Sequence, residues 1–115
     1  MKVKFGEYNI KTHELDSKLS VQISSDLGEI KMNDAGEGKH DFPNAVGCRI
    51  QGIEEENKPK AKGMKKFSFG EYTFILGINY AGDLLLFHSI KLNVGRKKIR
   101  GKDVLTLSFL SEPKA

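Results

Sequence analysis

Tyr72–His88 reads YTFILGINYAGDLLLFH, and this stretch decides the fold. Apolar residues dominate both sides of the central NYAGD, whose glycine and aspartate supply the backbone angles that a hairpin turn demands. Side chains alternate between the two faces of a strand, so one face of this antiparallel pair is predicted to be core. The core positions expected on that face are Tyr72, Phe74, Leu76, Ile78, Tyr80, Leu84, Leu86, His88, Ile90 and Leu92.

The rest of the chain carries the same kind of pattern. Short runs rich in Val, Ile, Phe and Tyr are punctuated by twelve glycines, which is typical of strands. Residues 12–17 are expected to form either one helical turn or a loop. The predicted strands cover residues 2–9, 18–25, 28–33, 45–53, 67–80, 84–94 and 103–110.

These strands predict an all-β protein of about seven strands. Two architectures fit: a small antiparallel barrel (OB-like, Greek key), which we favour, or a compact β-sandwich. The length of 115 residues and the hydrophobic share of 38% indicate one domain over residues 1–115. Residues 54–66 contain little to bury, so a flexible charged loop is expected there.

One short sequence motif occurs twice in the chain. Phe5–Tyr8 and Phe69–Tyr72 both read FGEY. A glycine inside a strand pattern usually marks a bulge or a bend, and two equivalent bends would help to curl a small sheet. Coincidence is the alternative, because the similarity stops at the edges of the motif.

Charge is distributed unevenly along the chain. Residues 1–57 carry seven Lys or Arg against eleven Asp or Glu, for a net charge of -4, while residues 58–115 carry twelve against four, for +8. The densest cationic run is Gly95–Asp103, which reads as a basic loop between two strands. Arginine forks and lysine point charges suit a phosphate backbone, although a solvated hairpin tip has the same composition. The candidate phosphate-binding residues of this run are Arg96, Lys97, Lys98, Arg100 and Lys102.

A second basic segment lies in the expected loop at 54–66. Its candidate phosphate-binding residues are Lys58, Lys60, Lys62, Lys65 and Lys66. Both basic segments flank the same central strands, so they could border one groove. Alternatively, Glu54–Glu56 could neutralise these lysines within the loop itself.

Binding of single strands also needs exposed rings on which bases can stack. Phe87 and Phe69 are predicted to project away from the hairpin core, and Tyr8 and Phe42 lie in less constrained places. Ordinary burial is the alternative for each of them. Phe87 is taken as the stacking candidate of the site.

Catalysis finds little support in the sequence. His88 is expected to be a core histidine, and no motif indicates that His13, His40 and Cys48 bind a metal. We therefore expect no enzyme activity, no cofactor and no metal. The longest apolar run has four residues, so no membrane insertion or export is expected, and a lone cysteine fits a cytoplasmic protein.

These observations predict a small non-enzymatic nucleic-acid-binding protein, for single-stranded DNA or RNA, that grips phosphates with basic loops. The alternative is a β-sandwich interaction module, an accessory or inhibitory protein. That module would use an apolar face around Ile75, Leu85 and Phe87 to dock a protein or to form a homodimer.

Overall fold

The computed structural model describes residues 2–15, 18–33, 42, 44–69, 72–88, 92–99 and 102–109, and their side chains over 2–13, 19–33, 42, 44–69 and 72–88. The described residues are nearly all in antiparallel strands, with one 3-10 turn, η1 (Glu55–Asn57). The strands are β1 (Lys2–Phe5), β2 (Tyr8–Leu15), β3 (Lys18–Ser24), β4 (Ile30–Asn33), β5 (Asn44–Ile50), β6 (Lys62–Phe69), β7 (Tyr72–Ile78), β8 (Leu84–His88), β9 (Leu92–Ile99) and β10 (Lys102–Phe109).

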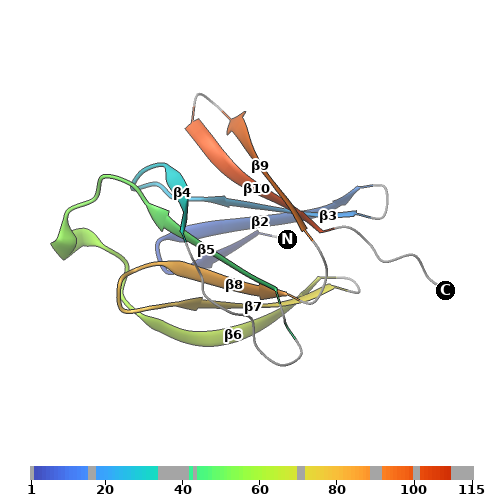
Figure 1. Cartoon of the computed structure of the whole chain (residues 1–115), viewed down its shortest axis with the longest axis horizontal. Coiled ribbons are helices and arrows are strands. Elements are labelled where there is room, and N and C mark those ends of the chain that lie inside the picture. The colour runs from blue at the N-terminus through green and yellow to red at the C-terminus, as the bar shows by residue number, and fades with distance from the viewer. Residues whose placement is uncertain are drawn as a thin grey trace.

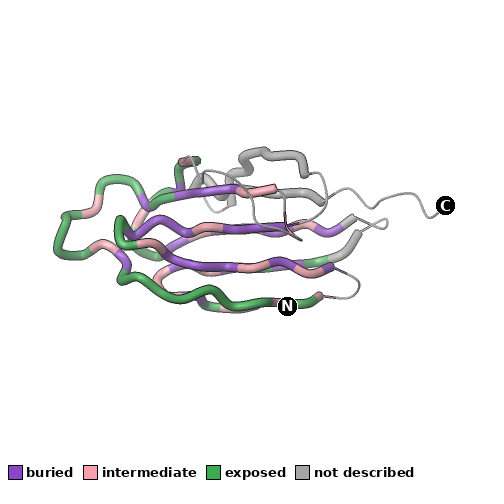
Figure 2. Tube along the Cα trace, turned by 60° about the horizontal axis from the view of Figure 1, so that its bottom comes forward, coloured by how far each residue is buried: buried purple, intermediate pink, exposed green. Residues whose placement is uncertain are grey.

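Two five-stranded sheets make up the molecule (Figure 1). The first sheet has the order β1-β2-β3-β10-β9 and the second has the order β4-β5-β8-β7-β6. Buried side chains of both sheets form one shared hydrophobic cluster between them, so the all-β expectation is confirmed in its sandwich form. Figure 2 shows the resulting alternation of buried and less buried residues along the strands.

The two sheets are related by an internal repeat. Strands β6, β7 and β8 occupy the same places in the second sheet that β1, β2 and β3 occupy in the first. In the same way, β4 and β5 of the second sheet correspond to β9 and β10 of the first. Each half of the chain therefore builds three strands of one sheet and lends two strands to the other.

The two FGEY motifs lie at equivalent places in this repeat. Phe5 pairs with Tyr8 across β1 and β2, and Phe69 pairs with Tyr72 across β6 and β7 in the same register. The prediction of a bend inside one strand over residues 2–9 is wrong, because Gly6 has a φ of 59° and turns the chain into a separate strand. Both copies thus mark the reversal between an edge strand and its neighbour.

The central hairpin was predicted correctly in its core. The side chains of Phe74, Leu76, Leu84, Leu86 and His88 are buried, and so are those of Tyr72 and Ile78. The side chains expected in the core at Ile90 and Leu92 lie outside the described residues. Tyr80 is the exception, because it lies in the β7–β8 turn and is 91% exposed.

Further boundaries differ from the prediction. The run at 84–94 is two strands, β8 and β9, and these belong to different sheets. The run at 67–80 is also two strands, since β6 ends at Phe69 and β7 begins at Tyr72. The predicted loop at 54–66 gives way to β6 at Lys62. The helical turn or loop expected at 12–17 is wrong as far as Leu15, because β2 extends to that residue.

Candidate nucleic-acid interface

The outward face of the first sheet carries three exposed lysines on its first two strands. Lys2 of β1 is paired with Lys11 of β2, and Lys4 is paired with Asn9 in the same way. Alternation sends Val3 and Ile10 to the core side and these lysines to the solvent side. Because paired residues lie about 5 Å apart at their Cα atoms, the three positive charges are close neighbours.

The same face continues onto β3 with uncharged polar groups. Gln22 is paired with Lys11 and Ser24 is paired with Asn9. A shallow open depression of about 500 Å³ lies over this part of the sheet. It is lined by Lys2, Val3, Lys4, Asn9, Ile10, Lys11, Gln22 and Ser24.

Carboxylates are missing from this surface as far as side chains are described on β1, β2 and β3. The outward positions of these strands are Lys2, Lys4, Asn9, Lys11, His13, Ser20, Gln22 and Ser24. Lysines, amides and hydroxyls can all donate hydrogen bonds to phosphate oxygens. We call this set of eight residues the outward face.

The register extends the outward face toward β9. Thr106 of β10 is paired with Gln22, and Val104 of β10 is paired with Lys97 of β9. Alternation places positions 97 and 102 in the outward set, while Arg96 pairs with Leu105, the partner of the buried Ile23. Lys98 pairs with Asp103.

The predicted basic loop at 95–103 is therefore mostly strand. Arg96, Lys97 and Lys98 lie in β9 and Lys102 begins β10, while Arg100 lies outside the described residues. A ladder from Ile99 paired with Lys102 to Leu92 paired with Phe109 holds the two strands together. These residues therefore belong to two paired strands and not to a loop.

The second basic segment is also partly strand. Lys58 forms an ion pair with Glu55, as the self-compensation alternative expected, and Lys60 is exposed. The remaining three lysines lie on the edge strand β6, against aromatic rings. The Nζ atoms of Lys62, Lys65 and Lys66 lie 5.7, 5.5 and 5.9 Å from the ring centroids of Phe5, Phe67 and Phe42. This is cation–π distance, and lysines on an edge also discourage pairing with foreign strands.

The two basic segments do not border one groove, and that expectation is wrong. β6 lies beside β1, because the rings of Phe5 and Phe67 are 6.1 Å apart in an edge-to-face contact. β9 lies at the opposite edge of the first sheet, four strands from β1. In Figure 1, β6 is at the bottom of the view and the β9–β10 hairpin is at the top. The outward face with Lys2, Lys4 and Lys11 spans the distance between them.

The prediction that Phe87 stacks on bases is also wrong. Its side chain is only 3% exposed, so it cannot present a flat ring to a base at the surface. Because Phe87 is buried, it also cannot belong to the apolar docking face of the alternative function. The other two residues of that face, Ile75 and Leu85, are half-buried. Tyr8 is buried, and Phe69 is packed against the core.

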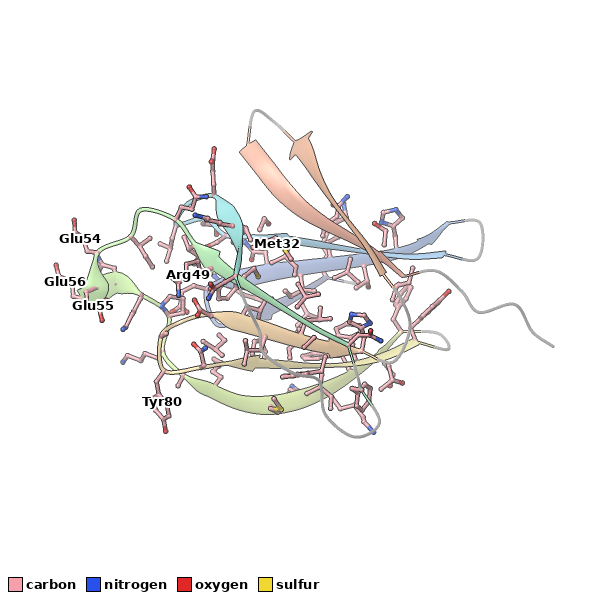
Figure 3. All side chains as sticks on the ribbon, viewed as in Figure 1. Met32, Arg49, Glu54, Glu55, Glu56 and Tyr80 are labelled. Carbon is pink, nitrogen blue, oxygen red and sulfur yellow. The ribbon has the colours of Figure 1, made fainter. Side chains whose placement is uncertain are left out.

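A polar network at one end of the sandwich serves the fold. Asp83, which is 4% exposed, accepts hydrogen bonds from Arg49 at 2.9 and 3.1 Å and from Asn33 at 2.7 Å. The hydrogen bonds to Asp83 raise the pKa of Arg49, whose guanidinium lies over the second sheet in Figure 3. The buried hydroxyl of Tyr8 donates to the carbonyl of Gly82 at 2.6 Å, which ties the first sheet to the β7–β8 turn.

Buried titratable groups near this network are held in their neutral forms. Burial raises the pKa of the Cys48 thiol to about 12, and the neighbouring Asp83 acts in the same direction. Burial likewise raises the pKa of Tyr8, with Cys48 and Asp83 adding to the effect. A nucleophilic cysteine needs a lowered pKa, so Cys48 lacks the character of a catalytic thiolate.

The described part of the chain shows no group of three or more His, Cys, Asp or Glu placed to hold a metal ion. Among the described residues no helix is long and apolar enough to cross a membrane. Comparison with protein-family models, curated proteins and solved structures finds no match for this chain.

Sequence reasoning missed Lys2, Lys4 and Lys11. The signal was present as alternation in KVK at 2–4 and NIK at 9–11, where polar residues flank an inward apolar one. Counting net charge over residues 1–57 concealed it, because eleven acidic residues, among them Glu7 in the β1–β2 turn and Asp26 just after β3, outnumber the seven basic ones.

Proposed function

We propose that this chain is a non-enzymatic nucleic-acid-binding protein that holds phosphates on the outward face of its first sheet. The single observation that carries the proposal is the composition of that face, where three lysines stand among amides and hydroxyls without a described carboxylate. Exposed lysines that lack acidic partners release counterions when they meet phosphates, and this release drives binding.

The internal repeat supplies a comparison within the same molecule. The two FGEY motifs align Lys11 of β2 with Ile75 of β7 and His13 with Gly77. Lys11 is thus replaced by an apolar residue in the second sheet, whereas Lys2 aligns with another lysine, Lys66, and Lys4 aligns with Ser68. The fold therefore does not demand lysine at position 11, which supports a binding role for Lys11.

The basic surface continues at both edges of this face. Lys62 and Lys65 adjoin β1 through Phe5 and Phe67, and positions 97 and 102 extend it at the far edge. No described ion pair involves Lys2, Lys4, Lys11, Lys62 or Lys65. The phosphate-binding role predicted for the β6 and β9–β10 cations is therefore kept as part of the proposal, with the outward face at its centre.

Fluorescence anisotropy with a labelled oligonucleotide of about 20 nucleotides tests the proposal. If Lys2, Lys4, Lys11 and the cations at 97 and 102 neutralise about five phosphates, the slope of log K on log salt is about -3.5 for a single strand. Lys11→Glu should reduce the steepness by about 0.7 and weaken binding about fivefold at ~0.1 M salt.

Lys31→Glu is the matched control. Lys31 is an exposed strand lysine of the second sheet, so its reversal changes the net charge equally but leaves the outward face intact. Equal losses in the two variants would mean that only net charge matters, and would refute a site on the first sheet. Absence of binding at low salt would refute the proposed function itself.

A further inference from the structure

The aromatic side chains of the described residues lie away from the outward face. Tyr8, Phe74 and Phe87 are buried, as are Phe5 and Tyr72. The half-buried ring of Phe67 is already occupied by neighbours, since it stacks on the ring of Phe74 at 5.8 Å and the Nζ of Lys65 lies 5.5 Å from its centroid. The eight residues of the outward face include no Phe or Tyr.

The one strongly exposed ring among the described side chains stands in the wrong place for stacking. Tyr80 is 91% exposed in the β7–β8 turn. It projects from the same end of the molecule as Glu54, Glu55 and Glu56, as Figure 3 shows. A nucleic acid that reached Tyr80 would approach three exposed carboxylates, which repel phosphate.

A face without rings gains nothing from unpaired bases. Stacking on an aromatic side chain contributes ~1 to 3 kcal/mol per base to single-strand binding, and this contribution is missing here. A duplex hides its bases and offers one negative charge per ~1.7 Å of axis, against one per ~3.4 Å for each strand. The same lysines therefore meet twice the charge density on a duplex.

Resting on the function proposed above, we propose that the outward face binds duplex nucleic acid through its backbone and does not read its sequence. Lys2, Lys4 and Lys11 hold phosphates at the β1–β2 end, and Asn9, Gln22 and Ser24 donate hydrogen bonds to phosphate or sugar oxygens beside them. Positions 97 and 102 lie across the sheet, two to four strand spacings or about 10 to 19 Å from the first group.

The expected preference follows from the charge count. About five neutralised phosphates give a slope of log K on log salt near -4.5 for a duplex and near -3.5 for a single strand. If the duplex and the single strand bind equally well at ~1 M salt, one unit of difference in slope makes duplex binding about tenfold tighter at ~0.1 M salt.

The experiment compares a labelled DNA duplex of about 20 base pairs with each of its separate strands, by anisotropy of the full chain across a salt series. A second duplex of the same length, with A·T pairs replaced by G·C pairs, tests sequence reading. We expect about tenfold tighter binding of both duplexes than of either strand, with similar affinities for the two duplexes.

Three results would overturn the inference. Equal or tighter binding of the single strands would show that bases are contacted after all, while leaving the proposed function in place. A tenfold difference between the two duplexes would show sequence reading. A Lys2→Glu/Lys11→Glu variant that keeps full duplex affinity would place the duplex elsewhere on the protein. No binding of any probe, by contrast, marks failure of the proposed function.

Discussion

Replacement of Tyr8 by phenylalanine removes one buried hydroxyl from the polar network at one end of the sandwich. That hydroxyl donates a 2.6 Å hydrogen bond to the carbonyl of Gly82, from the first sheet to the β7–β8 turn of the second. Tyr8 is fully buried and Gly82 is buried too, so water does not replace the lost donor. The ring stays in place, which leaves packing nearly unchanged.

The cost comes from the carbonyl that is left without its donor. An unsatisfied buried acceptor costs about 1 to 3 kcal/mol, so we expect Tyr8→Phe to lower the free energy of unfolding by about 2 kcal/mol. For 115 residues at about 2.1 cal/mol/K of unfolding entropy per residue, this loss corresponds to a decrease in Tm of about 8 °C.

Urea unfolding followed by circular dichroism, together with a thermal melt, measures both quantities. Tyr80→Phe is the matched control, because the Tyr80 side chain is 91% exposed and its hydroxyl is in water. The control should change the free energy of unfolding by less than about 0.5 kcal/mol. A Tyr8→Phe protein as stable as the control would refute the role assigned to this hydrogen bond.

Two further predictions concern alkaline pH and the first turn. Burial raises the pKa of Cys48 to about 12 and also raises that of Tyr8. As pH rises through the ordinary values of 9.0 and 10.0, the unfolded chain loses these protons first. Under reducing conditions the free energy of unfolding should then fall by up to about 1.4 kcal/mol per pH unit for each group. Cys48→Ala should flatten this decline in urea titrations between about pH 9 and 11, and an unchanged slope would contradict the assignment. Gly6→Ala should destabilise by about 1 to 3 kcal/mol, because φ is 59° and the new Cβ would lie 2.7 Å from Cδ1 of Ile78. Gly63→Ala, which meets nothing within 4 Å, is its control in the same melts, and equal effects of the two changes would count against this explanation.

The β7–β8 hairpin could be predicted from sequence because its signals are local. Alternating apolar residues and the Gly82–Asp83 turn lie within one short stretch, and the structure confirms the core positions from Tyr72 to His88 apart from Tyr80. The separation of β8 from β9 could not be predicted in this way. Residues 89–91 contain no glycine or proline, and the change of sheet there depends on contacts that are distant in sequence.

The candidate interface was predicted only in part, for the same reason. A run such as Arg96–Lys98 is visible as composition, but the edge on which it lies depends on how β10 pairs with β3. Lys2 and Lys11 are nine positions apart, and only the Gly6 turn makes them cross-strand neighbours. Charge that is scattered in sequence can therefore be gathered by register.

The exchange of strand pairs between the two halves makes the sheets mutually dependent. β4 and β5 complete a sheet begun by β6, β7 and β8, and β9 and β10 complete the one begun by β1, β2 and β3. A cut between η1 and β6 would yield two fragments, each with an unfinished sheet and a detached hairpin. Such fragments would regain the fold by recombining with each other, and the intact chain should lose its structure in one all-or-none step.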